Sequence, residues 1–301
     1  MYEAEHLFRL LAAYDNEIDA TVWQAMDVVL EEMDNLLRTV GDDNGTAIYE
    51  RFLSFASRLV TPAVSMVGWE SSPSDDHLGK LRRASVIALA GAYSEDPSVA
   101  ATALDYFKRI CADPDNSAAC ASELRNPILQ IAARHGGASE HAELLRIYSV
   151  SRTDADRKGV MLAVGHVPDI ALKKATLDWA LSGDVKLQDC FYPFFSVSES
   201  SFDGLQCCWD YFRSHFDVIN AKVGNANAHM MESFISAGCG TFADQEKADE
   251  VQAFFSTKSL PSNQRFISQM IENIRTNAAF LQRLLSGPVK TSDFFDKLFK
   301  D

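Results

Sequence analysis

The chain has 301 residues, of which 47% are hydrophobic, and it carries a net charge of −14 from 28 basic and 42 acidic side chains. This content suffices for a continuous core, while the acidic balance and the lack of basic clusters exclude a surface that follows nucleic-acid phosphates. No apolar run reaches the roughly 18 to 20 residues of a transmembrane helix, and the first residues do not resemble a signal peptide. We expect a soluble, cytoplasmic protein without a nucleic-acid partner or a transmembrane segment.

Helical periodicity begins near the N-terminus and recurs along the chain. In residues 21–37, apolar side chains repeat at steps of three and four, and the pattern includes Val22, Met26, Val29, Leu30 and Met33. This spacing places them on one helix face. Similar spacing returns in residues 81–89 and 99–110, and alternating strand patterns between tight hairpin turns are not found. The sequence therefore predicts an all-α protein.

Short breaker segments separate the predicted helices, for example GDDNGT, SEDPS, HGGAS and SGPVKTS. Each supplies Gly, Pro or a side chain that can accept a backbone N–H at a helix start. In SEDPS, Asp96 can cap the next helix while Pro97 occupies its first position. Short loops between helices of about 10 to 20 residues favour antiparallel pairs. We expect a right-handed stack of such pairs, a bowl-shaped armadillo- or HEAT-like superhelix, with a compact bundle as the alternative.

Motifs for metal binding or nucleophilic catalysis are absent from the sequence. None of the seven histidines begins an HExxH motif, and His135 and His141 could converge only through the loop between them. The six cysteines lack CxxC spacing, which favours reduced and mostly buried thiols. The segment GCGTF is better explained as a helix end at Gly238 or Gly240 than as an anion-binding loop. We predict no catalytic and no metal-ligating residues in this chain.

The densest aromatic segment is QDCFYPFFSVS, which contains Phe191, Tyr192, Phe194 and Phe195. At helical spacing, aromatic side chains belong to a core more often than to a ligand groove. Pro193 should lie near a helix start. Tyr192, whose hydroxyl needs a partner, is the one candidate here for contact with a bound peptide.

A long amphipathic helix is expected over residues 265–285. Its apolar stripe leaves Glu272, Asn273 and Arg275 on the flank. Glu272 and Arg275 are three residues apart and could pair on the helix surface, which implies no chemistry.

This last helix, RFISQMIENIRTNAAFLQR, also resembles the terminal helix of zinc aminopeptidases related to puromycin-sensitive aminopeptidase, aminopeptidase N and the endoplasmic-reticulum aminopeptidases. Arg265, the run 272–274 and Asn277 ahead of residues 278–280 match the family pattern. Further segments are similar and follow the family's order, among them VGWESSPSDDHLGKLRR, LRNPILQIAARHGG, CCWDYFRSHFDVI and KADEVQAFFSTK. The resemblance covers nearly the whole chain and is closest to the puromycin-sensitive branch.

In that family, an all-helical C-terminal domain closes over a thermolysin-like catalytic domain and encloses the peptide. The catalytic HExxH motif, its distant Glu ligand and the Gly-x-Met-Glu-Asn loop are missing from this sequence. The resemblance therefore implies that residues 1–301 are a single noncatalytic, substrate-enclosing and regulatory C-terminal domain, inactive alone. Zinc would bind in the absent catalytic domain, and the partners would be that domain and peptide substrates. The alternative is a free-standing helical-repeat scaffold that binds a protein partner.

One departure limits this transfer. Endoplasmic-reticulum relatives use basic residues of this domain to receive a peptide's C-terminal carboxylate, and two such positions fall near Gly165 and Glu199, which cannot do so. Arg125, in LRNP, is our substitute for a peptide contact, and a structural ion pair is its alternative role. The predicted peptide-contacting residues are thus Tyr192 and Arg125.

Overall fold

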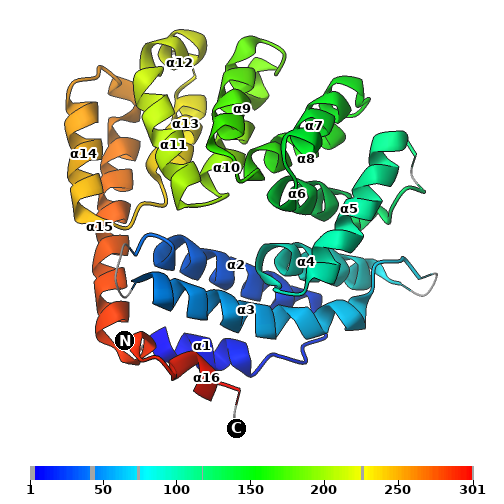
Figure 1. The fold of residues 1–301 in the computed structure, drawn as a ribbon. Coiled ribbons are helices and arrows are strands. Elements are labelled where there is room, and N and C mark those ends of the chain that lie inside the picture. Colours follow the sequence, from blue (N-terminus) through cyan, green and yellow to red (C-terminus); the bar gives the residue numbers. More distant parts are fainter. Residues whose placement is uncertain (1–3, 41–44, 73–74, 117, 225–226, 300–301) are drawn as a thin grey trace. The chain divides into compact units, whose positions relative to one another are not determined.

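The computed structural model describes residues 4–40, 45–72, 75–116, 118–224 and 227–299. Within these ranges the regular elements are sixteen α-helices and five short 3-10 helices, and no residue is in a strand (Figure 1). The predicted all-α, helical-repeat fold is confirmed. None of the described helices is both long enough and apolar enough to cross a bilayer.

The chain divides into two compact units. Unit 1 contains residues 1–135, 150–152 and 282–301, and unit 2 contains residues 136–149 and 153–281. The assignment of residues 1–301 to one C-terminal domain stays a prediction, so each unit is described by itself.

Unit 1 is built mainly from the first six α-helices. Helices α2, α4 and α6 lie next to one another in one layer, with α3 and α5 packed against them. This arrangement matches the stacked helix pairs expected from the short loops. Its elements are α1 (Ala4–Ala12), α2 (Ala20–Leu37), α3 (Gly45–Val67), α4 (His77–Tyr93), α5 (Pro97–Ala112), η1 (Ser122–Leu124), α6 (Arg125–His135), η5 (Pro288–Lys290) and α16 (Phe294–Lys297).

Aspartate side chains cap several helices of unit 1. The carboxylate of Asp76 accepts a hydrogen bond from the backbone N–H of Gly79 at 2.7 Å, and that of Asp96 accepts one from Ser98 at 2.8 Å. Pro97 is the first residue of α5, where its missing N–H costs nothing. The predicted start of this helix is confirmed.

The core of unit 1 combines the apolar stripe of α2 with a cluster of phenylalanines. Met26, Leu30 and Met33 are buried as predicted. Trp23, which the periodicity did not single out, is fully buried, and its indole N–H donates to the carbonyl of Glu17 at 3.0 Å. The aromatic rings that join α1, α3 and α16 are those of Phe8, Phe52, Phe55, Phe294 and Phe295.

Unit 2 continues with short helices and holds most of α15. Helix α10 packs on α8, α9, α11 and α13 and so lies at the centre of this unit. Pro193 is in its first turn, as predicted. The elements are α7 (Ala138–Val150), α8 (Asp154–Ala163), η2 (Val164–His166), α9 (Ile170–Ser182), η3 (Leu187–Asp189), α10 (Tyr192–Ser198), α11 (Phe202–Ser214), α12 (Phe216–Val223), α13 (Ala228–Cys239), α14 (Gln245–Ser256), η4 (Pro261–Asn263) and α15 (Gln264–Ser286).

Gly165 has a packing role at the contact between η2 and α10. A Cβ atom there would lie 2.5 Å from the backbone nitrogen of Val197 and 2.7 Å from the hydroxyl of Ser196. The Gly165 N–H donates to that hydroxyl at 2.6 Å. Residue 165 must therefore lack a side chain so that the two backbones can approach each other.

The predicted polar flank of the long C-terminal helix lies on α15. Glu272, Asn273 and Arg275 are exposed beside the buried Ile271 and Ile274. The predicted local pair of Glu272 and Arg275 is replaced by a tertiary one, because Arg275 donates to Asp249 on α14 at 2.8 Å. The predicted helix end in GCGTF is confirmed at Gly240, the C-cap of α13.

Candidate functional site

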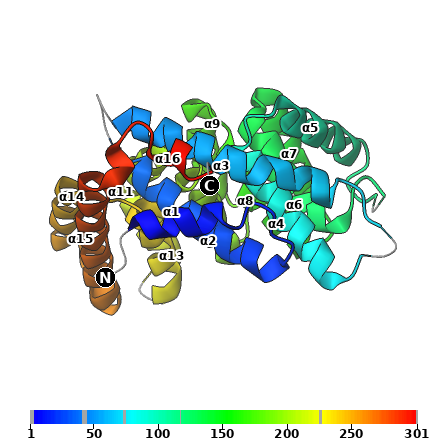
Figure 2. The same cartoon turned by 90° about the horizontal axis from the view of Figure 1, so that it is seen from below.

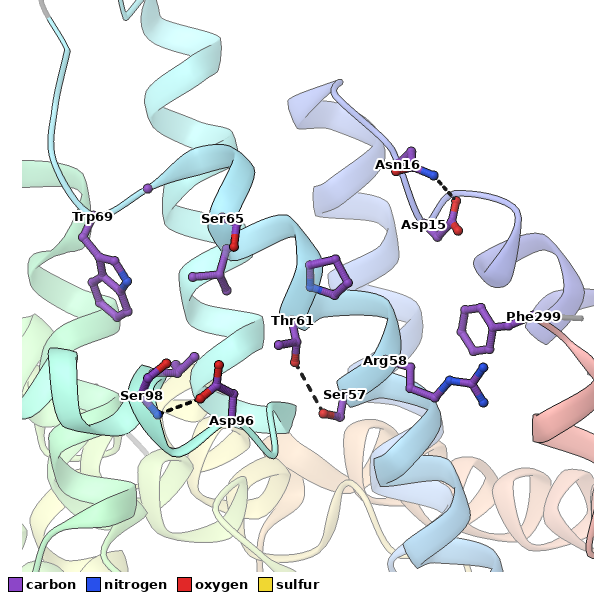
Figure 3. Close-up of a pocket in the computed structure, with 14 residues that line it drawn as sticks. Asp15, Asn16, Ser57, Arg58, Thr61, Ser65, Trp69, Asp96, Ser98 and Phe299 are labelled. Carbon is purple, nitrogen blue, oxygen red and sulfur yellow. Dashed lines mark hydrogen bonds between the residues drawn. The ribbon is translucent and has the colours of Figure 1, made fainter.

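A pocket of about 850 Å³ opens in unit 1 (Figure 3). Its walls come from the turn after α1, the middle of α3, the connection that follows α3, the start of α5 and the C-terminal segment. The pocket is rich in polar groups. Its polar and aromatic lining residues are Asp15, Asn16, Ser57, Arg58, Thr61, Ser65, Trp69, Asp96, Ser98 and Phe299.

Hydroxyl groups of α3 form one wall of this pocket. The Thr61 hydroxyl lies 2.8 Å from that of Ser94, and Ser57 accepts a hydrogen bond from the Glu95 N–H at 2.9 Å. Pro62 lies inside α3 and has no N–H to donate to the carbonyl one turn earlier, at Arg58. This wall therefore offers hydroxyl groups as hydrogen-bonding partners for a ligand.

Aromatic and charged side chains form the remaining walls. The indole of Trp69 stacks on the ring of Tyr106, with 5.9 Å between centroids and 16° between planes. The Arg58 guanidinium lies 4.4 Å from the centroid of Phe299 and 3.5 Å from the carboxylate of Asp296. A bound segment could thus contact a flat aromatic surface and a guanidinium.

The Trp69 segment is held in place by a buried ion cluster, which we call the Arg83 cluster and which consists of Arg83, Asp75 and Glu123. The guanidinium of Arg83 lies 2.5 Å from each of the two carboxylates and donates to the Val67 carbonyl at 3.1 Å. Only 4% of Arg83 is exposed. These bonds tie both ends of the connection between α3 and α4 to α4 and η1.

The charges in the Arg83 cluster shift the pKa values of its acids. Burial alone would raise the pKa of Glu123, but hydrogen bonds and the charge of Arg83 outweigh it and hold that pKa below the usual value. The backbone N–H of Ser72, followed by Arg83, lowers the pKa of Asp75. Both carboxylates therefore stay ionised at neutral pH and keep their ion pairs with Arg83.

A hydrogen bond also holds Glu70, the residue that follows Trp69 in the connection between α3 and α4. The Tyr106 hydroxyl donates to the Glu70 carboxylate, and burial together with this bond raises the pKa of Tyr106 to about 12. Trp69, stacked on the same tyrosine, is consequently presented to the pocket by a preorganised segment.

The described lining of the pocket offers hydroxyl, charged and aromatic groups that can bind a ligand. A serine or threonine nucleophile needs a base within hydrogen-bonding reach. The described residues that line the pocket include neither His nor Cys. The Asp96 carboxylate is occupied as a helix cap, and hydrogen bonds from Ser98 lower its pKa, which makes it a weak base.

Two of the histidines, His135 and His141, serve as hydrogen-bonding partners within their units. The Nε2 atom of His141 lies 2.9 Å from the Thr176 hydroxyl, and burial lowers the pKa of this imidazole. The Nε2 atom of His135 lies 3.1 Å from the Gly91 carbonyl in unit 1. Across the described residues, no three His, Cys, Asp or Glu side chains gather as metal ligands would.

All six cysteines are free thiols, as the sequence predicts. Four are buried, and Cys111 and Cys120 are partly exposed. Burial raises the pKa of both Cys208 and Cys239, which disfavours the nucleophilic thiolate.

The two predicted peptide-contacting residues belong to different units, and neither lines the pocket in Figure 3. Tyr192 is the first residue of α10 and is half-buried, with the Lys158 ammonium 4.6 Å from its ring centroid. Arg125 is the first residue of α6 and donates to the Pro114 carbonyl at 2.8 Å. Their contact with peptide stays a prediction.

Sequence reasoning did not identify Trp69 and Arg83 as site residues. Both lie in the segment VGWESSPSDDHLGKLRR, which served only as a point of family resemblance. A usable signal was present, because Arg83 falls three residues before Val86 on the apolar face of α4, where a charged side chain needs buried partners.

Comparison with known proteins links this chain to a family. The model of the ERAP1-like C-terminal domain matches residues 2–276. Aminopeptidase M1 of Arabidopsis thaliana is 24% identical over 281 residues, which cover 92% of this chain and 31% of the relative. Aminopeptidase 2, mitochondrial, of Saccharomyces cerevisiae is 21% identical over 284 residues, covering 92% and 28%.

Another relative belongs by name to the puromycin-sensitive branch, which the sequence resemblance indicates. Puromycin-sensitive aminopeptidase of Caenorhabditis elegans is 22% identical over 286 residues, which cover 91% of this chain and 29% of the relative. The chain thus spans 28 to 31% of the length of these three curated relatives.

Proposed function

Because the chain belongs to the ERAP1-like C-terminal domain family, we propose that it is the noncatalytic, substrate-enclosing and regulatory domain of a zinc aminopeptidase. The observation that carries this proposal is the family match over residues 2–276. The relatives named above support it, because they are aminopeptidases of which this chain matches less than a third. The catalytic zinc would be bound by the rest of such a parent protein.

The proposed contribution of this chain to turnover is confinement of the peptide. Helical-repeat layers supply an extended wall without chemistry of their own. Closure of such a wall around a catalytic domain would exclude folded proteins and hold a flexible peptide near the zinc. The fixed Trp69 and the hydroxyl wall of α3 are suited to transient contacts with peptide groups.

Tyr192 and Arg125 remain our proposed peptide contacts outside this pocket. Tyr192 offers a partly exposed ring beside an ammonium group, and Arg125 begins α6. The proposed location is cytoplasmic. The six free thiols support a reducing compartment, although the name of one relative places that protein in mitochondria.

The proposal is tested by assaying the purified 301-residue chain for hydrolysis of aminoacyl fluorogenic substrates, with and without added zinc. We expect no hydrolysis above a buffer control, together with a helical circular dichroism spectrum that is unchanged by a metal chelator. Zinc-dependent hydrolysis by this chain alone would overturn the noncatalytic assignment. If the parent reading frame carried no catalytic segment, a free-standing scaffold would replace the aminopeptidase assignment.

A further inference from the structure

An apolar groove runs between α1 and α2 in unit 1. It has a volume of about 310 Å³, and eight of its nine lining residues are hydrophobic. Leu7 and Leu10 line it from α1, Tyr14 lines it from the turn that follows, and Val22, Ala25 and Val29 line it from α2. The pocket around Trp69 is polar by contrast, so the two surfaces fit different partners.

Large apolar side chains of α1, α2 and the turn between them are exposed to solvent. Leu10, which lines the groove, is 53% exposed, while Val28 on α2 and Ile18 in the turn, which do not line it, are 56% and 71% exposed. A groove lined almost entirely by apolar side chains, with an exposed leucine at its wall, marks an interaction site. The chain has a net charge of −14, so an apolar groove contrasts with the excess of acidic side chains in the chain as a whole.

The turn that presents Ile18 is fixed by hydrogen bonds on both sides. Its N–H donates to the Glu17 carboxylate at 2.6 Å, and its carbonyl accepts a hydrogen bond from Arg82 on α4. These two hydrogen bonds hold the backbone of Ile18 in a conformation in which its side chain is exposed.

Helix α1 cannot roll to cover the groove, because its opposite face is already packed. Phe8 is fully buried and lies 5.7 Å from Phe55 and 5.1 Å from Phe295, measured between ring centroids. Figures 1 and 2 both show α1 and α16 beside α3, which agrees with these contacts. Rotation that buried Leu10 would remove Phe8 from this cluster, at a greater loss of buried area.

We propose that the groove between α1 and α2 is the docking surface for the part of the parent aminopeptidase that precedes this domain. This inference rests on the proposed function. Between 69 and 72% of the length of these relatives lies outside the segment that this chain matches, and in a C-terminal domain that polypeptide joins ahead of α1. Because α1 itself lines the groove, polypeptide that enters at this helix is the nearest candidate to cover it.

The chemistry of the groove favours this occupant over a substrate or a second copy. Permanent interfaces are more apolar than transient ones, and a covalently linked partner is always present to cover Leu10. Peptide substrates vary in side chains and leave after each turnover, which suits the polar pocket better. The occupant should present aliphatic or aromatic side chains to the groove.

The test measures association in trans between this chain and the preceding part of the parent, expressed as a separate polypeptide. Leu10→Glu and Ala25→Glu place a charge in the groove at exposed positions. Leu78→Glu is the matched control, because Leu78 is 54% exposed on α4 and does not line the groove. Circular dichroism and the unfolding midpoint of each variant show whether it is folded.

We expect both groove variants to raise the dissociation constant at least about tenfold, while Leu78→Glu leaves it within about twofold. Equal affinity of wild type and groove variants would overturn the groove as the docking surface and leave the proposed function intact. Failure of the wild-type chain to associate at all would instead contradict the proposed function. A dimer of the isolated chain that Leu10→Glu dissociates, with no effect on association with the preceding part, would assign the groove to a second copy.

Discussion

Replacing Arg83 by methionine should destabilise unit 1 strongly. Arg83 is 5% exposed at its side chain and lies 2.5 Å from both Glu123 and Asp75, whose side chains are 10% and 17% exposed. Methionine fills much of the same space but leaves the acids without their cation. Removing one partner of a buried ion pair costs about 3 to 5 kcal/mol.

The expected loss lies at the lower end of that range. Glu123 keeps slight exposure and can recruit water, so we assign about 3 kcal/mol to the broken pair with Arg83. With a urea dependence of about 3 kcal/mol per molar, the midpoint should fall by about 1 M. Arg58→Met is the matched control, because its pair with Asp296 is 3.5 Å long with both side chains widely exposed. That variant should change stability by less than about 1 kcal/mol.

The pH dependence provides an independent check on the Arg83 cluster. The folded pKa values of Glu123 and Asp75 lie below their ordinary values. Their stabilising effect is therefore fully present above those ordinary values and is lost as the pH falls through the folded ones. In urea titrations followed by tryptophan fluorescence, the gap between wild type and Arg83→Met should shrink below about pH 4. A gap under about 1 kcal/mol at pH 7, or one that does not change with acid, would refute this reasoning.

Three further predictions concern packing, a buried acid and the thiols. Gly165→Ala should lower the unfolding free energy by about 2 kcal/mol or more in urea titration because its Cβ meets backbone, whereas Gly137→Ala, which has open space, should not; equal effects would contradict the packing role. Burial raises the pKa of Asp27 to about 6, a stabilisation present below the ordinary value and lost as the pH rises through 6. Asp27→Asn should therefore raise the thermal midpoint at pH 8 and not at pH 4, and equal changes at both would contradict this assignment. Ellman's reagent should react quickly with at most Cys111 and Cys120 in the native chain and with six thiols in guanidinium, so fast reaction of a third native thiol would contradict the burial.

Helix boundaries could be predicted wherever the decisive contact is local. Asp96 caps α5, Pro97 is its first residue, and Pro193 lies in the first turn of α10, because a cap or a missing N–H acts within one turn. The apolar stripe of α2 could likewise be predicted from its spacing, since one face of an amphipathic helix must be buried.

Side-chain partners could not be predicted where a distant segment competes. Arg275 pairs with Asp249 on α14 instead of Glu272 on its own helix, because the tertiary partner is also within reach. Arg83 is a core residue although charged, because two acids from other segments surround it. Spacing within one helix contains no information about such partners.

The pocket itself had no local signal in the sequence. Its walls join residues as far apart in the chain as Asp15, Trp69 and Phe299. Only the folded arrangement of α3, α5 and the C-terminal segment brings these groups together. Family resemblance identified the segment around Trp69 without assigning it a role.

The central claim is that this domain confines peptides for a catalytic centre elsewhere in a parent protein. The most direct measurement compares cleavage rates for peptides of graded length, and for a folded protein with a free N-terminus, by the catalytic part alone and by the same part joined to this chain. The account predicts that joining this chain suppresses cleavage of the folded protein and changes the preferred peptide length. Identical length profiles for the two forms would contradict it.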